Sequence, residues 1–286
     1  MKEYLADLGT PQGDCLSPVL SALYISLLLN TYLPWDLEQD TNCLFFVDDG
    51  TLCASTPTMT HNVSILKRSI ELLADYFLKI GIRIEPTKTE LMHFTAFDLS
   101  KGPRTFKHKH QPNLFFDVAG VTHRIQPKGV WRYLGFFFDS FLKFHHHVRY
   151  YTNKAFSTIR ACGMLGNSWR GLSLRNRTLA YKAVTLPVLT YRLVLWYAEN
   201  GRGVKKHLMT MRRVHNFALR WITGAFKGTP SGVLEMIAHI LLLDIWCNLS
   251  IYGLMACIHT LPDSHLLKMA WQGSLVKLAY RWIRPK

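Results

Sequence analysis

Residues 43–54 read Cys-Leu-Phe-Phe-Val-Asp-Asp-Gly-Thr-Leu-Cys-Ala, and this stretch decides the fold of the first part of the chain. Two apolar runs of strand-forming residues flank Asp48-Asp49-Gly50, and Asp-Gly is a preferred turn dipeptide. The pattern therefore predicts a β-hairpin with both aspartates at its tip. A tight turn can bring adjacent carboxylates to one point, where hard oxygen ligands suit magnesium. An ordinary hairpin turn without a catalytic role is the alternative at this stage.

Helical and extended patterns surround the predicted hairpin. Ser17-Pro18 has the chemistry of a helix start, and residues 63–77 carry apolar side chains three and four apart. Gly81 suits the C-terminal cap of the second helix. Strands are predicted at 82–84, 91–94, 114–118, 121–125 and 131–138. Beyond Leu142 the pattern is helical, so the sequence predicts the α+β class, with a mixed unit followed by a helical unit.

Charge is distributed unevenly along the chain. Residues 1–100 hold 6 Lys and Arg against 13 Asp and Glu, a net of −7, whereas residues 101–286 hold 28 against 6, a net of +22. The basic part predicts contact with a polyanion such as nucleic acid, and a solvated surface that aids solubility is the alternative. The six cysteines form no Cys-x-x-Cys pair, so neither a zinc site nor a secreted disulfide framework is indicated.

One apolar stretch, residues 237–261, is long enough to cross a membrane. It contains His239, Asp244, Asn248 and His259, and polar or ionised groups are costly inside a bilayer. The stretch is therefore predicted to be a buried helix or helix pair, and we expect no membrane span. The N-terminus lacks the apolar region of a signal peptide.

Two motifs could contact a phosphorylated ligand. Gly9 and Gly13 would let the backbone approach a ligand closely, and Gln12 between them could hydrogen-bond a base, sugar or phosphate. Lys88, in a predicted turn, could reach a phosphate or give a proton to departing pyrophosphate. An ordinary Gly/Pro turn and a solvated surface lysine are the alternatives.

Three further features admit a structural and a functional interpretation. Residues 132–136 (Arg-Tyr-Leu-Gly-Phe) are predicted as part of a strand whose glycine admits another backbone, or as a packed core strand. Arg212, Arg213 and Arg220 lie among aromatic residues, which suits nucleic acid, or they form a solvated helix face. Residues 145–147 are consecutive histidines that point three ways on a helix, which favours surface histidines over a metal site.

The order of these motifs resembles the conserved blocks of reverse transcriptases. The blocks are Gly-x-Pro-Gln-Gly, Leu-Ser-Pro, Phe-Val-Asp-Asp, Pro-Thr-Lys-Thr-Glu and Tyr-Leu-Gly, in that sequence. The chain is most similar to the non-LTR (LINE-like) retrotransposon branch. Residues 171–196 and 222–230 are similar to the region that follows the polymerase in these elements, so the resemblance covers nearly the whole chain.

The resemblance implies a fold and a reaction. Residues 1–138 would be a partial, ferredoxin-like palm that includes the primer-grip strand, and residues 139–286 an all-helical thumb and connector. The reaction would be RNA-directed DNA polymerisation, with two Mg²⁺ ions assisting nucleotide transfer. The implied partners are an RNA template, a DNA primer and deoxynucleoside triphosphates. The implied location is intracellular, in the nucleus, and the oligomeric state stays open.

The resemblance also implies a role for each motif. Gly9, Gln12 and Gly13 would contact the template and the incoming nucleotide. Asp48 would bind metal with Asp49 beside it, and Lys88 would be the lysine of the fourth block. Tyr133, Leu134 and Gly135 would form the primer grip.

Two departures from the family pattern bear on activity. Phe46 stands where the family usually has tyrosine, a change that LINE-like enzymes often show. The family's palm begins with a strand that carries another essential metal-binding aspartate, and Asp7 lies too close to Gly9 to replace it. We therefore expect a fragment that lacks the first palm strand and is inactive alone. The alternatives are a catalytically dead nucleic-acid-binding remnant and a fragment that never folds.

Overall fold

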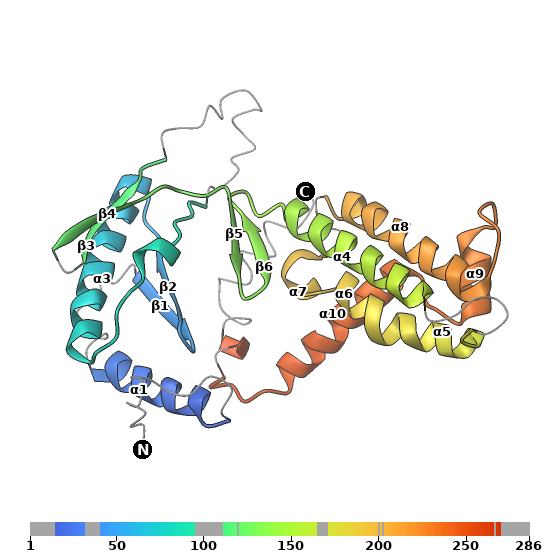
Figure 1. Cartoon of the computed structure of the whole chain (residues 1–286), viewed down its shortest axis with the longest axis horizontal. Helices are drawn as coiled ribbons and strands as arrows, with labels where there is room; N and C mark the ends of the chain where they lie inside the picture. Colours follow the sequence, from blue (N-terminus) through green and yellow to red (C-terminus); the bar gives the residue numbers. More distant parts are fainter. Residues whose placement is uncertain are drawn as a thin grey trace, which may run out of the picture. The chain divides into compact units, whose positions relative to one another are not determined.

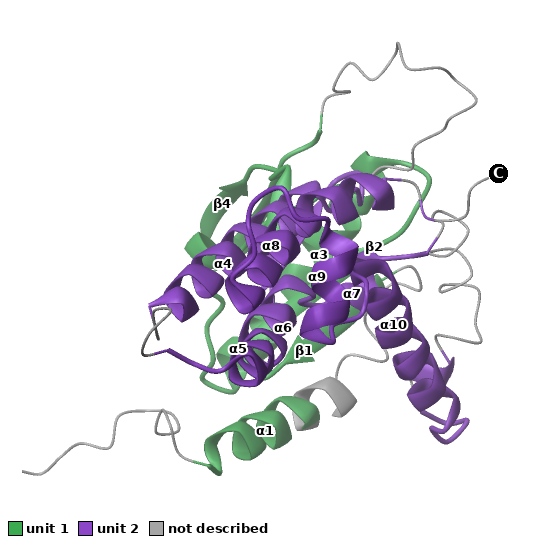
Figure 2. Cartoon of the chain, turned by 90° about the vertical axis from the view of Figure 1, so that its right-hand side faces the viewer, with its two compact units in different colours: residues 1–131 green, residues 132–286 purple. Residues whose placement is uncertain are grey.

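The chain divides into two units, residues 1–131 and 132–286, which Figure 2 shows in green and purple. In this computed structural model, the residues described are 15–31, 41–94, 111–118, 120–164, 171–199, 201, 203–265 and 267–269.

In its described residues, the first unit combines two helices with two β-hairpins (Figure 1). Its elements are α1 (Ser17–Thr31), β1 (Thr41–Phe46), β2 (Asp49–Ala54), α3 (Met59–Lys79), the 3₁₀ turn η1 (Pro86–Lys88), β3 (Leu114–Val118) and β4 (Val121–Ile125). Both hairpins are antiparallel; β1 and β2 pair from Thr41 opposite Ala54 to Phe46 opposite Asp49. The predicted strands at 114–118 and 121–125 are confirmed.

Helix α3 is the centre of this unit. The Thr58 hydroxyl caps its first turn by accepting the amide of His61 at 3.3 Å, and Gly81 ends it with a φ of 78°. The apolar stripe of α3 buries Ile70 against β3, and Leu73 and Phe77 against the β1–β2 hairpin. The predicted amphipathic helix and its glycine cap are therefore confirmed.

Two predicted strands of this unit do not form. Residues 82–84 have no strand partner, and in 91–94 only Leu91 makes an isolated bridge, with Pro127. A strand needs a continuous row of partner amides and carbonyls, and proline has no amide to extend the ladder. Among the described residues, the single bridge at Leu91 is therefore the only strand pairing of these two segments.

The second unit is almost entirely helical. A hairpin of β5 (Val130–Tyr133), which starts in the first unit, and β6 (Phe136–Asp139) leads into it. The helices are α4 (His145–Gly163), α5 (Leu174–Ala180), the π-helical segment η3 (Tyr181–Thr185), α6 (Leu186–Leu189), α7 (Leu193–Trp196), α8 (Val204–Thr223), α9 (Ser231–Ala238) and α10 (Leu243–His259). The π-helical segment precedes Pro187, whose missing amide interrupts the regular helical ladder.

The core of the second unit lies between α4 and α8. Ala155 and Ile159 of α4 and Met211 and Ala218 of α8 are all 0% exposed, and the small alanines let the two helices approach closely. Figure 1 shows the two helices running alongside each other.

The apolar stretch at 237–261 forms the end of α9, a break and α10, which confirms the predicted helix pair. The expected burial is only partial, because Ile245, Leu249 and Tyr252 of α10 are exposed. Among the described residues, no single helix is long and apolar enough to cross a membrane. Helices α9 and α10 reach that length and composition only together, and they are bent by 54° at the break.

These elements place the chain in the α+β class, as predicted. The described strands form three separate two-stranded sheets. The assignment of palm and thumb, and their division after residue 138, stay predictions.

Candidate active site

The β1–β2 hairpin presents two adjacent carboxylates at its tip. Strand β1 ends at Phe46 and β2 begins at Asp49, so Val47 and Asp48 make the two-residue turn, and both aspartates are exposed. Val47 has a φ of 58°, an unusual conformation for a β-branched residue. Backbone strain of about 1–3 kcal/mol of this kind persists where the surrounding structure enforces it, and it clusters at functional sites.

The turn is at Val47-Asp48, two residues before the predicted Asp49-Gly50 turn, and Gly50 is a strand residue. Gly50 is inside β2, opposite Phe45, and a Cβ atom there would lie 2.6 Å from the Phe45 ring. The ring crosses the glycine and meets Phe77 of α3 edge-on, with ring centroids 5.9 Å apart. The predicted Asp49-Gly50 turn is therefore wrong, and the glycine instead lets Phe45 anchor the hairpin to α3.

The chemistry of the aspartate pair fits magnesium. Mg²⁺ prefers oxygen ligands and commonly binds one or two protein carboxylates together with waters and substrate phosphates. Asp48 and Asp49 can supply those carboxylates. In the described part of the chain, no group of three or more His, Cys, Asp or Glu side chains is placed to hold a metal ion. The pair is thus suited to be part of a metal site rather than a closed cage.

Lys88 lies on the η1 turn of the same unit. The Glu85 carboxylate accepts the Thr87 hydroxyl at 2.6 Å and the Thr87 amide at 3.3 Å, and these hydrogen bonds lower the pKa of Glu85. The turn is thereby fixed, and Lys88 is exposed at its end. Within the described residues, no hydrogen bond or ion pair joins Lys88 to Asp48 or Asp49. The predicted contacts of Gly9, Gln12 and Gly13 fall outside the described residues.

The predicted primer-grip segment is a hairpin turn, not a continuous strand. Leu134 and Gly135 separate β5 from β6, and their φ angles are 46° and 79°. Two positive φ angles in a two-residue loop are the mark of a type I′ turn, which matches the twist of a hairpin. The prediction of one strand over 131–138 is therefore wrong. Tyr133 ends β5 just before the turn.

Two tyrosine hydroxyls donate hydrogen bonds to the carbonyls of this turn. The Tyr151 hydroxyl of α4 donates to the Gly135 carbonyl at 2.6 Å, and the Tyr191 hydroxyl donates to the Leu134 carbonyl at 3.3 Å. Their rings stack with centroids 4.6 Å apart and an interplanar angle of 23°. Sequence reasoning missed both residues, because they lie far from the turn in the sequence and belong to no local motif.

His147 supports the same arrangement and is not a surface histidine. It is 1% exposed; its Nδ1 accepts the Phe137 amide at 3.3 Å, and its Nε2 lies 3.1 Å from the Tyr191 carbonyl. These contacts fit the neutral tautomer with the proton on Nε2, and burial lowers the pKa of His147 to about 4. The prediction of surface histidines fails for His147 because its helical position faces the core, whereas His145 and His146 are exposed.

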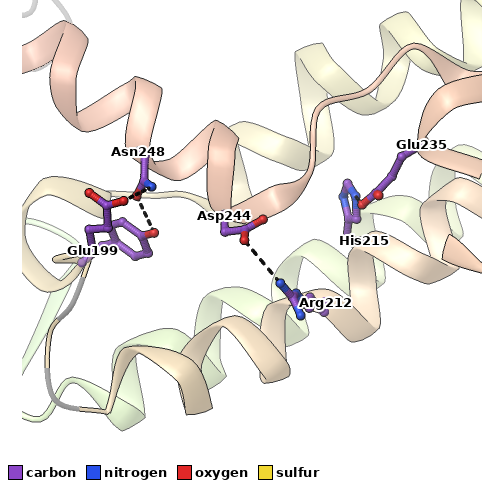
Figure 3. Close-up of polar contacts among 7 residues, drawn as sticks. Glu199, Arg212, His215, Glu235, Asp244 and Asn248 are labelled. Atoms are coloured by element: carbon purple, nitrogen blue, oxygen red, sulfur yellow. Dashed lines mark hydrogen bonds and ion pairs between the residues drawn. The ribbon is translucent and has the colours of Figure 1, made fainter. Parts of the chain in front are cut away.

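The three predicted arginines of α8 have different environments. Arg212 pairs with Asp244 at 3.6 Å, as Figure 3 shows. Arg220 donates to the carbonyls of Asn216 and Lys227 at the end of the helix. Arg213 instead lines a groove between α4 and α8. Neighbouring residues on a helix are about 100° apart, so adjacent arginines face different surroundings.

Comparison with known proteins connects these sites to a reaction. Residues 2–138 match the family described as "Reverse transcriptase (RNA-dependent DNA polymerase)". The chain is 23% identical over 221 residues to the RNA-directed DNA polymerase from mobile element jockey of Drosophila funebris. Residues 2–138 are a LINE-like reverse transcriptase region. The jockey alignment covers 76% of this chain, so the similarity continues beyond the reverse transcriptase region into the helical unit.

The same alignment covers 22% of the jockey polymerase, so the chain spans about a fifth of that relative's length. No solved structure matches the chain significantly. Both the Asp48–Asp49 hairpin and the Leu134–Gly135 turn lie within residues 2–138, the segment that matches reverse transcriptases.

Proposed function

We propose that this chain provides the metal-binding hairpin and the primer-holding turn of an RNA-directed DNA polymerase that works as part of a longer protein. The observation that carries the proposal is the Asp48–Asp49 hairpin, with strained Val47 before it, inside the segment that matches reverse transcriptases. Two exposed carboxylates on a hairpin anchored by Phe45 and Gly50 are suited to binding a divalent ion beside a polyphosphate.

Each residue has a defined task in this proposal. Asp48 binds the metal and Asp49 assists beside it; bound Mg²⁺ would neutralise the triphosphate and activate the primer hydroxyl. Lys88 donates a hydrogen bond or proton to the departing pyrophosphate. The Leu134–Gly135 turn holds the primer end, and it is rigid because both of its carbonyls accept tyrosine hydroxyls. Gly9, Gln12 and Gly13 contact the template and the incoming nucleotide.

Exposed apolar side chains support action within a longer polymerase. Leu44 and Phe46 share one face of the β1 strand and are 62% and 56% exposed, while the opposite face packs on α3. Helix α1 likewise exposes Leu20 and Leu23. Large apolar patches of this kind commonly mark surfaces that another segment covers. Because the described carboxylates also form only part of a metal site, we expect the isolated chain to be inactive.

The charge of the second unit supports a nucleic-acid partner. Residues 132–286 contain 22 Lys and Arg against 5 Asp and Glu, a net of +17. All five acidic side chains are engaged internally. Asp139 accepts backbone amides, Glu199 accepts Asn248 and Tyr252, Glu235 accepts His215, Asp244 pairs with Arg212, and Asp263 pairs with Lys268. Because the unit holds 17 more basic than acidic side chains, most of its cations have no carboxylate of the unit to pair with and can bind phosphates.

A catalytically dead nucleic-acid-binding remnant is the second candidate, since the basic surface does not depend on the aspartate pair. The two candidates differ in one property. A remnant binds nucleic acid but does not polymerise in any setting, whereas the proposed polymerase region polymerises once the rest of the enzyme is supplied. The nuclear location implied by the family stays a prediction.

A chimera tests the proposal. The chain replaces its matching segment in the jockey polymerase, and primer extension on an RNA template is measured with Mg²⁺. We expect extension by the chimera and none by the chain alone. A folded chimera that binds template but never extends the primer would favour the dead remnant. Extension by the isolated chain would show that its own residues complete the metal site.

A further inference from the structure

A groove between α4 and α8 has the composition of a phosphate-binding site. It has a volume of about 440 Å³, and its lining includes Arg149, Thr152, Asn153 and Phe156 from α4 and Thr210 and Arg213 from α8. No carboxylate is among its lining residues. The two arginines come from facing helices, so they can approach one anion from two sides.

Thr152 supplies the observation that points most directly to a ligand. It is 6% exposed, and its buried hydroxyl has no hydrogen-bond partner. A threonine inside a helix usually donates to the carbonyl four residues earlier, and Thr158 does so at 2.9 Å on the same helix. A buried hydroxyl without a partner is unfavourable, so Thr152 is arranged for a group that enters the groove. Threonine has two accessible χ1 rotamers in helices, so a rotation of about 120° about χ1 can turn the hydroxyl to a ligand.

Aromatic rings lie beside the cations. Phe156, which lines the groove, packs on Phe217 of α8 with ring centroids 4.9 Å apart, and the Arg160 guanidinium lies 4.4 Å from the Phe156 centroid. Single nucleic-acid strands bind where basic grooves follow the backbone and aromatic rings lie next to it. Phe156 packs against the core of the unit and also lines the groove, so one ring lies next to the two arginines.

We propose that the α4–α8 groove binds the phosphodiester backbone of a nucleic-acid strand, with Arg149 and Arg213 on the phosphate and Thr152 donating a hydrogen bond. The planar guanidinium fork matches phosphate oxygens, and the Asn153 amide can add a further donor. This inference rests on the proposed function, and it assigns the contact to Arg213 and Arg149. Arg212 and Arg220 hold the fold through Asp244 and two carbonyls.

Binding is measured with the full chain by fluorescence anisotropy. The probes are a labelled single-stranded RNA, a single-stranded DNA and an RNA–DNA hybrid, each about 12 nucleotides long, within the usual site size of ~4–16 nucleotides. We expect Arg149→Gln and Arg213→Gln each to weaken binding about tenfold, as loss of a charged hydrogen bond does. Each change should also reduce the slope of log K against log salt by about 0.7 to 0.9, the value for one phosphate contact.

Two matched variants separate this role from general charge and from folding. Arg175→Gln removes the same charge from an exposed position of α5 outside the groove, and it should leave the affinity within about twofold. Thr152→Val keeps the volume and removes the hydroxyl. It should leave the melting temperature unchanged or raised, because the hydroxyl has no partner in the fold, and weaken binding about threefold to tenfold.

The outcomes distinguish the groove from the proposed function. If the chain binds nucleic acid but the groove variants behave like Arg175→Gln, the groove assignment is overturned and the polymerase proposal stands. If poly-glutamate competes as well as RNA, the surface attracts any polyanion, and the assignment is likewise overturned. If the unaltered chain binds none of the three probes, nucleic-acid binding by this unit is overturned together with the groove. Comparison of the probes identifies which kind of strand occupies the site.

Discussion

Gly135→Ala should destabilise the helical unit by about 1.5–3.5 kcal/mol. A φ of 79° costs a non-glycine residue about 1–2 kcal/mol. The new Cβ atom would lie 3.0 Å from the Tyr191 hydroxyl, which must give way, and 3.5 Å from the Tyr151 hydroxyl, which is an ordinary contact. Displacing the Tyr191 hydrogen bond to the turn adds about 0.5–1.5 kcal/mol. Urea unfolding followed by the helical circular dichroism signal measures the change.

Gly224→Ala is the matched control. Gly224 ends α8 with a φ of 72°, and no atom lies within 4 Å of a Cβ atom built there. Its replacement should carry only the backbone cost, about 1–2 kcal/mol. If Gly135→Ala is no more destabilising than Gly224→Ala, the tyrosine hydroxyls do not fix the turn, and the argument for a rigid primer grip is refuted.

Further perturbations of the helical unit have equally definite outcomes. Burial holds the pKa of both His147 and His207 at about 4, below the ordinary value of 6.5. As pH falls the unfolded chain takes up these protons first, so stability should be full above pH 6.5 and decline toward pH 4. Urea unfolding at several pH values tests this, and a flat profile would contradict it. Tyr181→Phe removes the hydroxyl that meets His215 Nδ1 at 2.7 Å in the core, which should lower stability by about 1–3 kcal/mol. An unchanged thermal unfolding curve would show that this nitrogen finds another partner.

Local patterns in the sequence predicted most of the elements. The helix over 63–77, its Gly81 cap and the helical second half depend on spacing and capping within a few residues. The β1–β2 hairpin was predicted for the same reason. Its turn was misplaced because Gly50 serves the packing of Phe45, and turn propensity alone does not distinguish these two uses of a glycine.

Non-local contacts account for the features that the sequence could not predict. Leu134 is a poor residue for a positive φ, so propensity favoured a continuous strand; Tyr151 and Tyr191, distant in the sequence, hold the turn. His147 is buried by its position on α4, while its neighbours are exposed. Tertiary packing overrides local preference at such places.

Among the predicted catalytic and binding residues, some positions also follow from local sequence patterns and others depend on non-local packing. The Asp48–Asp49 pair followed from the hairpin pattern, and its exposed position at the tip agrees with that prediction. The predicted nucleic-acid-binding arginines have different surroundings, because Arg212 meets Asp244 on α10 and Arg213 lines the groove beside α4, and their binding stays a prediction. Which cation faces a groove depends on how helices pack, and composition does not contain that information.

The most direct test of the central claim is the rate of Mg²⁺-dependent primer extension by the jockey chimera carrying Asp48→Asn. The exchange keeps the shape of the side chain and removes a charged ligand. Asp75→Asn, at an exposed position of α3 in the same unit, is the control for loss of one negative charge. The account predicts that Asp48→Asn abolishes extension while Asp75→Asn leaves it unchanged. Extension by Asp48→Asn at the rate of the control would contradict the assignment of this hairpin to the metal site.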